Sequence, residues 1–206
     1  DSWMVDSLKA LKDKVGRQVM ISDPEKQKPN RFMAEVKANG DDYYVYKDEE
    51  SVDREAQRRA KRDLQEMPQT FNDSFLRDHI YMTETDRRMT AQEEARHHFD
   101  TLDDQEIIEE AEAWGIETDD PAKAREEVEM QKADEIKKDL EDPMQYFVGD
   151  RGLYTEQELL EQSFIRIDTD EASEQAVRMD GAEHFLHDHT GRVDLGRGKG
   201  VAYRVQ

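Results

Sequence analysis

RFMAEVKANGDDYYVYK, residues 31–47, contains the pattern that decides the fold. Phe32, Ala34 and Val36 alternate with polar residues before Asn39-Gly40, and Tyr44 and Tyr46 alternate after it. Alternation at every second residue places side chains on one face of a strand. Asn-Gly accepts the positive φ angles that a tight hairpin turn requires. The stretch therefore predicts a β-hairpin.

A second hairpin is expected at the far end of the chain. Apolar residues alternate on both sides of the glycine-rich stretch GRGKG in GRVDLGRGKGVAYRV (191–205). Shorter strand patterns occur at 17–22 and 164–168, and DPEKQKPN (23–30) is typical of a polar loop. These segments predict a small antiparallel sheet assembled from hairpins that are distant in the sequence.

Most of the remaining chain has helical periodicity with recognisable ends. Helices are predicted over 48–68, over 86–102 after Thr85, from 103 to Gly115, after Asp120-Pro121, and over 170–186 with a break at Gly181. Thr155 and Glu158 have the spacing of a capping box. The predicted fold class is α+β, mostly α, with helices surrounding the small sheet.

Composition limits the size of the core and the kinds of partner. Charged residues make up 39% of the 206 residues and hydrophobic ones 35%, which predicts a thin core. One domain over 1–206 is expected, with a subdivision into 1–68 and 69–206 as the alternative. There is no cysteine, which excludes disulfides and thiolate metal sites. No apolar run is long enough to cross a membrane and no signal-peptide layout is present, so a cytoplasmic location is expected.

The formal charge of −21 is concentrated in residues 100–142, which hold 18 acidic and five basic residues, a net of −13. Such a surface repels nucleic acid and anionic membranes and attracts basic proteins. The predicted partner-binding face consists of Asp103, Asp104, Glu106, Glu109, Glu110, Glu112, Asp119, Asp120, Glu126, Glu127 and Glu129. The simpler interpretation is that these acids form a solvated face.

Three of the six histidines lie in HFLHDHT (184–190). His184, His187, Asp188 and His189 are candidate metal ligands, because neutral imidazole and carboxylate both bind zinc and similar ions. However, the spacing matches no established ligand signature. The simpler interpretation is that a helix ends near Leu186 and that 187–191 turn the chain into the last hairpin, since histidine is favoured at helix C-termini.

Signatures of known catalytic sites are absent from the sequence. It has no phosphate-binding G-x-x-x-x-G-K-[ST] loop, no G-x-S-x-G nucleophile motif and no thiol nucleophile. We therefore predict neither catalytic residues nor a cofactor. The basic run from Arg54 to Arg62 is expected to pair with neighbouring acids, Glu55 among them, at helical spacing.

Several short motifs resemble uncharacterised acidic proteins encoded in tailed-phage genomes. They are Tyr44-Val45-Tyr46 before Asp48-Glu49-Glu50, Asp180-Gly181, His184-Phe185-Leu186, and Ala202-Tyr203-Arg204. The resemblance spans 43–206 and implies no activity. It implies that His184 is a structural residue and that His187 and His189 belong to a turn. It also implies action in the cytoplasm of a bacterial host or in the virion.

Three hypotheses about function follow. The first is a non-enzymatic interaction protein, in one version a DNA mimic whose carboxylates replace phosphates on a basic host nucleic-acid-binding protein. The second is a structural or virion-associated protein in which Trp114, Tyr146, Phe147 and Tyr154 form an exposed apolar patch for assembly. The simpler interpretation is that these four residues belong to the hydrophobic core. The third is a metal-dependent enzyme that uses the C-terminal histidines. The sequence does not indicate an oligomeric state.

Overall fold

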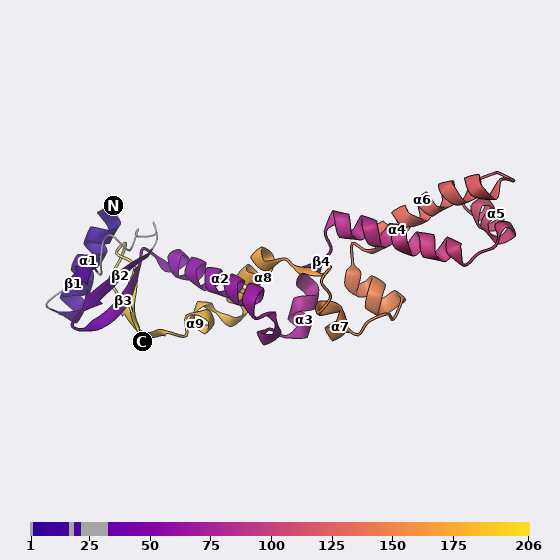
Figure 1. Ribbon diagram of the computed structural model, residues 1–206. Coiled ribbons are helices and arrows are strands. Elements are labelled where there is room, and N and C mark those ends of the chain that lie inside the picture. The colour runs from indigo at the N-terminus through magenta and orange to yellow at the C-terminus, as the bar shows by residue number, and fades with distance from the viewer. Residues whose placement is uncertain (1, 17–18, 22–32) are drawn as a thin grey trace. The chain divides into compact units, whose positions relative to one another are not determined.

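The computed structural model describes residues 2–16, 19–21 and 33–206 (Figure 1), so the predicted loop at 23–30 lies outside the described residues. The chain forms two compact units. Unit 1 combines Asp1–Thr70 with Thr169–Gln206, and unit 2 is Phe71–Asp168. Thr169–Gln206 therefore group with the N-terminal segment, whereas the sequence-based subdivision placed them with residues 69–168. That the whole chain is one folding domain stays a prediction.

Unit 1 contains a five-stranded antiparallel sheet in the order β1-β2-β3-β7-β6. The strands are β1 (Val19–Ile21), β2 (Met33–Ala38), β3 (Asp41–Tyr46), β6 (His189–Asp194) and β7 (Val201–Val205). β3 pairs with β7, so the two predicted hairpins join into one sheet. The predicted class, α+β with a small antiparallel sheet from distant hairpins, is confirmed.

The turn between β2 and β3 forms at the predicted residues. Asn39 and Gly40 have φ angles of 53° and 87°, which only glycine and a few polar residues adopt readily. In this register Val36 lies opposite Tyr43 and shares its face of the sheet. Tyr44 and Tyr46 consequently point to the opposite face.

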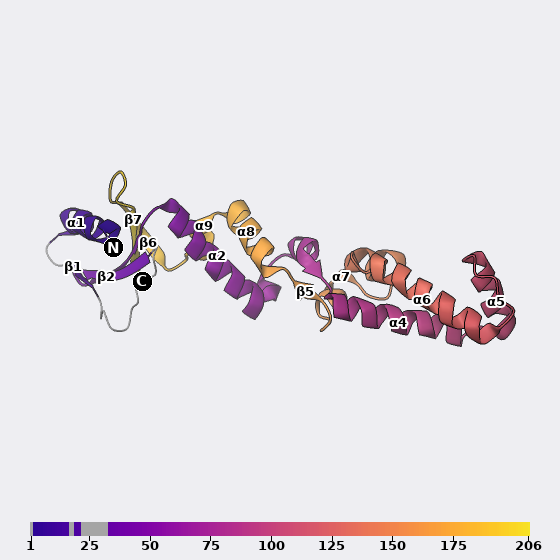
Figure 2. The same cartoon turned by 90° about the horizontal axis from the view of Figure 1, so that it is seen from above.

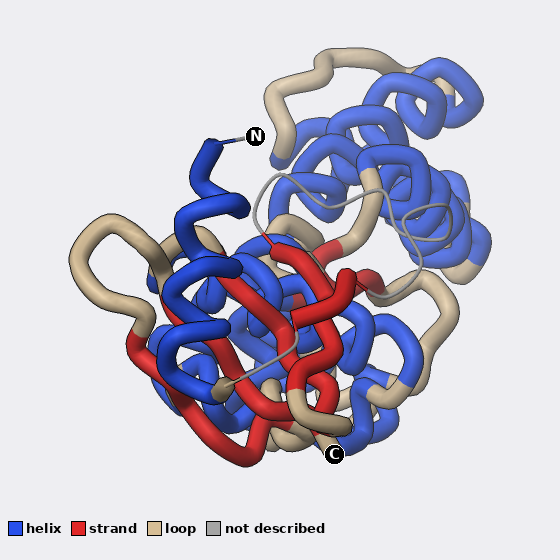
Figure 3. Tube along the Cα trace, turned by 90° about the vertical axis from the view of Figure 1, so that its left-hand side faces the viewer, coloured by secondary structure: helices blue, strands red, loops and turns tan. Residues whose placement is uncertain are grey.

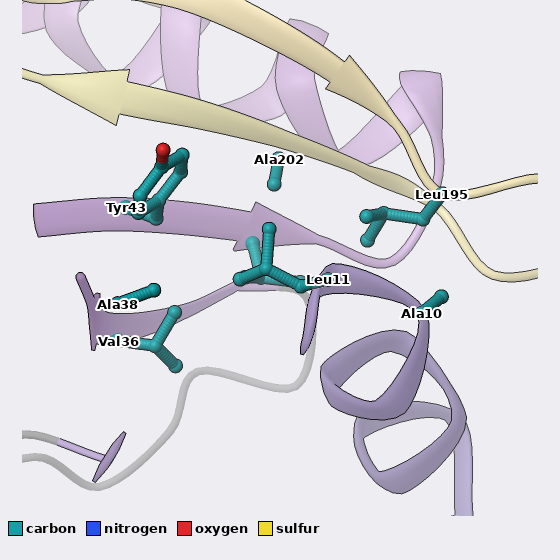
Figure 4. Close-up of a cluster of buried hydrophobic side chains, with 8 residues drawn as sticks. Ala10, Leu11, Val36, Ala38, Tyr43, Leu195 and Ala202 are labelled. Atoms are coloured by element: carbon teal, nitrogen blue, oxygen red, sulfur yellow. The ribbon is translucent and has the colours of Figure 1, made fainter. Parts of the chain in front are cut away.

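One face of the sheet is covered by α1 (Ser2–Val15), which Figure 3 shows lying across the strands. Leu11 of α1 is fully buried and points towards the strands (Figure 4). The buried side chains of this cluster come from α1, from β2, β3 and β7, and from the residue after β6; they are Ala10, Leu11, Val36, Ala38, Tyr43, Val45, Leu195 and Ala202. Because Tyr43 and Val45 of β3 pack under α1, the side chains of Tyr44 and Tyr46 lie on the opposite face of the sheet.

Three more helices complete the main helical part of unit 1: α2 (Glu49–Glu66), α8 (Thr169–Asp180) and α9 (Ala182–Phe185). α2 packs against α8 and α9. Buried alanines on α2 and α8 allow a close helix–helix approach; they are Ala56, Ala60, Ala172 and Ala176. A single turn of 3₁₀-helix, η1 (Pro68–Thr70), follows α2.

Gly200 allows the chain to enter β7. Its φ is +80°, and a Cβ atom there would lie 1.9 Å from the carbonyl oxygen of Tyr46. Any other residue would collide with the backbone at the end of β3. The glycine-rich stretch is therefore a structural turn, as the sequence predicts.

Unit 2 is built around two long helices, α4 (Glu84–Asp100) and α6 (Pro121–Asp139), which lie side by side in both views (Figures 1 and 2). Lys137 pairs with Glu84 at one end and Arg125 with Asp100 at the other, so the helices are antiparallel. α5 (Asp104–Ala113) connects them. We call α4, α5 and α6 the arm.

The rest of unit 2 consists of short elements. They are α3 (Asp73–Leu76), the 3₁₀-helix η2 (Arg77–His79), β4 (Ile80–Tyr81), the π-helix η3 (Gln145–Asp150), α7 (Glu156–Leu160) and β5 (Arg166–Ile167). β4 and β5 pair as a two-stranded antiparallel ribbon. Tyr146 and Phe147 are buried, and Trp114 and Tyr154 are half-buried. The apolar patch proposed for assembly is therefore not exposed, and core packing is the correct interpretation of these residues.

The predicted N-terminal caps of α6 and α7 are confirmed, and the predicted cap of α4 is wrong. Asp120 caps α6, and Thr155 with Glu158 forms a capping box at α7. α4 begins two residues earlier than predicted, because Thr83 rather than Thr85 is the N-cap. The Thr83 hydroxyl accepts a hydrogen bond from the Asp86 amide at 3.1 Å.

Candidate functional site

A polar network lies on the sheet face opposite α1. His189 Nδ1 donates to Asp188 Oδ1 at 2.7 Å, and the Tyr46 hydroxyl donates to His189 Nε2 at 2.8 Å. Arg59 holds Asp188 through two hydrogen bonds, of 2.5 and 3.2 Å. Arg59 Nε also donates to Glu55 at 3.0 Å. These five residues, the histidine network, connect α2, β3 and the start of β6.

The network is largely excluded from solvent. The side chains of His189, Glu55 and Arg59 are 2%, 7% and 11% exposed, and Tyr46 is fully buried. The rings of Tyr44 and Tyr203 lie 5.3 and 5.1 Å from the His189 ring, centroid to centroid. Aromatic packing around the imidazole therefore supplements its two hydrogen bonds.

Burial and pairing shift the pKa values of the network in opposite directions. Burial alone would raise the pKa of Asp188, but hydrogen bonds from Arg59 and His189 outweigh it and hold the pKa at about 2. Burial lowers the pKa of His189 despite the neighbouring carboxylate. Burial would also raise the pKa of Glu55, and the hydrogen bonds of Arg58 and Arg59 lower it instead. The network thus contains ionised acids, a neutral imidazole and a charged guanidinium near neutral pH.

An Asp–His–Tyr chain has the bonding pattern of a proton relay, yet this one is closed. Tyr46 occupies the only nitrogen of His189 that Asp188 leaves free, and neither ring is open to solvent. Both ring nitrogens of His189 are therefore engaged within the protein, and the network connects α2 with the sheet.

The structure separates the four candidate metal ligands. His184 and His187 are exposed, and the His184 ring packs edge-on against Phe185. Asp188 and His189 face inward into the histidine network. No group of three ligating side chains that could hold a metal ion occurs within 2–16, 19–21 and 33–206.

One sequence interpretation of the histidines is wrong. His189 does not belong to the turn, because β6 begins at this residue and its side chain is buried. Residue type alone could not single it out, since His184 and His189 both lie close to the end of a helix. The structural role that the resemblance to phage proteins implies for His184 stays a prediction.

The ion pair between Arg59 and Asp188 was not predicted from the sequence. The predicted pairing of Arg59 with Glu55 is confirmed, but the bond to Asp188 joins residues 129 positions apart. No local spacing could indicate it.

The predicted acidic residues occupy the arm, and they divide into two groups. Seven have structural partners: Asp103 and Glu106 form the capping box of α5, Asp120 caps α6, Glu109 accepts a hydrogen bond from Gln105, and Glu110, Glu127 and Glu129 pair with His98, Lys123 and Arg125. The other four are exposed: Asp104, Glu112, Asp119 and Glu126. Only part of the face is therefore available to a partner.

An open hollow of about 830 Å³ lies beside α5. Its lining comes from α5 and the following loop: Gln105, Ile108, Glu112, Gly115, Glu117, Thr118 and Asp119. Among these residues Ile108 is half-buried, and Glu112, Glu117 and Asp119 are exposed. We call this hollow the acidic tip. Its lining combines an apolar side chain with three carboxylates.

Comparison with protein family models, with curated proteins and with solved structures found no match. Among the described residues, no helix is both long and apolar enough to cross a membrane. The resemblance to phage proteins stays a prediction.

Proposed function

We propose that this chain is a non-enzymatic interaction module that binds a basic protein through the acidic tip. The observation that carries the proposal is one hollow lined by the apolar side chain of Ile108 together with the carboxylates of Glu112, Glu117 and Asp119. Carboxylates attract a cationic surface and set the orientation of approach, and the apolar contact adds affinity.

The tip is preorganised for binding. Asp103 and Glu106 cap α5 reciprocally, and Asp120 with Pro121 fixes the start of α6. Lys132 lies 5.9 Å from the Trp114 ring centroid, which connects the end of α5 with α6. Because both flanking helices are fixed, little conformational entropy is lost on binding.

A narrower version of the proposal is DNA mimicry. Proteins that bind nucleic acids present a positive track to a polyanion, and exposed carboxylates on a helical arm supply a comparable series of negative charges. In this version the partner is a nucleic-acid-binding protein in the cytoplasm of a bacterial host.

The test is affinity capture from bacterial lysate at low salt, followed by elution in a salt gradient and mass spectrometry. The expected result is one dominant basic protein that elutes as ionic strength rises, because salt screens exposed charges. Elution of that protein by competing DNA would support mimicry in particular. A protein retained equally at low and high salt would contradict the electrostatic basis of the proposal.

Matched variants localise the interaction. The variant E112Q/E117Q/D119N removes three charges at the tip and should abolish retention. The variant E93Q/E161Q/E183Q removes three exposed charges elsewhere and should keep it. Equal losses in the two variants would show that binding depends on net charge and not on the tip.

A further inference from the structure

A second hollow, of about 580 Å³, lies along the arm between α4 and α6. We call it the arm groove. Ala91 and Ala133 contribute small side chains to it, and Met130 is 63% exposed. Small residues along a helix pair permit another helix to approach closely. The groove is separate from the acidic tip.

The two walls of the arm groove carry opposite charges. Arg88 and Arg96 lie on α4, and Glu126 and Asp134 lie on α6; all four are exposed. Within the described part of the chain, none of the four forms an ion pair. The other cations of the groove are engaged, since Arg125 pairs with Asp100 and Glu129, and Lys137 with Glu84.

The charges on the two walls have the same spacing. Arg88 and Arg96 are eight residues apart, and so are Glu126 and Asp134, which corresponds to about 12 Å along a helix. The ion pairs at the two ends of the arm set the register between the helices. In that register Asp134 lies level with Arg88, and Glu126 lies level with Arg96.

We propose that the arm groove is the interface of a homodimer. The two copies meet groove to groove, with the two-fold axis parallel to the helices, so that α4 of each copy lies over α6 of the other. Arg88 then meets Asp134 of the second copy, and Arg96 meets Glu126 of the second copy. The two-fold axis repeats both contacts, which gives four ion pairs around an alanine and methionine centre.

The charge pattern selects both this occupant and this orientation. A two-fold interface must be complementary to itself, and the groove presents matched cations and anions at the same levels. The other face-to-face arrangement, with the axis across the helices, would place α4 on α4 and bring arginines against arginines. The charge of −21 on each copy opposes association at low ionic strength, and salt screens that long-range repulsion. The dimer should therefore strengthen from low to physiological ionic strength, whereas capture by the acidic tip should weaken.

The first experiment is sedimentation velocity of the purified chain over a wide concentration range at physiological ionic strength. A concentration-dependent dimer is expected. A monomer at every concentration would overturn the proposal and would leave the proposed function untouched, because the acidic tip is a different surface.

Charge reversal tests the pairing itself. The variants R88E/R96E and E126R/D134R should each raise the dimer dissociation constant at least about a hundredfold, because like charges then face each other. When the two are mixed, every contact is again between opposite charges, and a heterodimer should form. The combined variant R88E/R96E/E126R/D134R keeps the net charge of −21 and should form a homodimer again.

Controls separate the interface from net charge and from folding. R166E/R197E makes the same change in net charge at exposed arginines outside the groove and should leave the dimer intact. A dimer that persists in R88E/R96E would place the interface elsewhere and overturn the proposal. Failure of the mixed variants to associate, while each keeps the native circular dichroism and melting curve, would overturn it as well.

Discussion

In unit 1, Arg59 lies 11% exposed between the carboxylates of Glu55 and Asp188, whereas the ion pairs of the arm in unit 2 lie on the outer surfaces of helices. A buried charge without its partner costs several kcal/mol, and an exposed pair contributes less than about 1 kcal/mol. The arm must therefore rely on a narrow apolar seam for its stability. Ion pairs of the same chemical kind therefore contribute very different amounts to stability, according to how deeply they are buried.

The largest expected effect comes from the apolar seam of the arm. Phe99 is fully buried against residues of α5, α6 and the loop between them. Replacement by alanine should destabilise unit 2 by about 4 kcal/mol through lost burial and a residual cavity. Hydrogen exchange measured by mass spectrometry should show lost amide protection in α4, α5 and α6 while β2 and β3 keep theirs.

Met89→Ala is the control for that prediction, because Met89 is 61% exposed and its truncation should cost less than about 0.5 kcal/mol. Equal loss of protection in both units after Phe99→Ala would mean that they unfold together. In that case the different burial of ion pairs in the two units would not give the units separate stabilities.

The second effect tests the histidine network. Arg59→Leu leaves Glu55 and Asp188 without their shared cation and should lower the free energy of unfolding by about 3 kcal/mol. Arg58→Leu removes a cation that also pairs with Glu55 but is 60% exposed, and it should cost less than about 1 kcal/mol. Urea unfolding followed by circular dichroism gives both values. If both variants lowered the free energy of unfolding by similar amounts, burial of the arginine would not determine how much its ion pair contributes.

The third effect is a dependence of unit 1 on pH. The pKa of Asp188 is about 2 in the folded chain, below the ordinary 3.8, because Arg59 and His189 outweigh the effect of burial. This group therefore contributes about 2 kcal/mol at neutral pH, which is lost as the pH falls through 3.8 towards 2. The pKa of His189 is also lowered, by burial, so its contribution begins to fall below pH 6.5.

Urea unfolding of the native chain and of Asp188→Asn, compared between about pH 7 and about pH 3, measures this dependence. The difference in stability between the two proteins should shrink as the pH falls. A difference that stays constant with pH would show that the Asp188 carboxylate is not stabilised in the ionised form.

The smallest effect is expected on the surface of the arm. Lys123 and Glu127 form an exposed pair one helical turn apart on α6. Lys123→Gln should change the free energy of unfolding by less than about 0.5 kcal/mol, because water screens the pair and the side chains lose entropy on pairing. Thermal unfolding is sufficient to measure it. A loss comparable with that of Arg59→Leu would remove the distinction between the two units.

Local signals in the sequence predicted the elements whose geometry is decided by a few neighbouring residues. Asn39-Gly40 forms the predicted turn, and Asp120-Pro121 starts the predicted helix. Thr85 was the wrong cap because Thr83 lies at an equally suitable position two residues earlier, and the extended backbone at Thr83 decided between them.

Features that depend on distant residues could not be predicted. The Arg59–Asp188 bond joins α2 to the start of β6, which are brought together by the packing of α8 and α9 on α2 and by the pairing of β7 with β3. The roles of the individual acidic residues on the arm could not be predicted either. Its composition indicated a charged surface, but only the structure shows that Asp103 and Asp120 cap helices while Glu112 and Asp119 line a hollow.

The order of strands in unit 1 has a consequence for synthesis on the ribosome. β3 finds its neighbour β7 only after residues 47–205 have been made, which takes about 8 to 30 seconds at ordinary translation rates. During that interval the nascent hairpin has an unpaired edge that another chain could join. Asp41 and Asp42 lie at the start of that edge, and their charges discourage such pairing. The whole of unit 2 leaves the ribosome within the same interval, so the arm can fold before the sheet is complete.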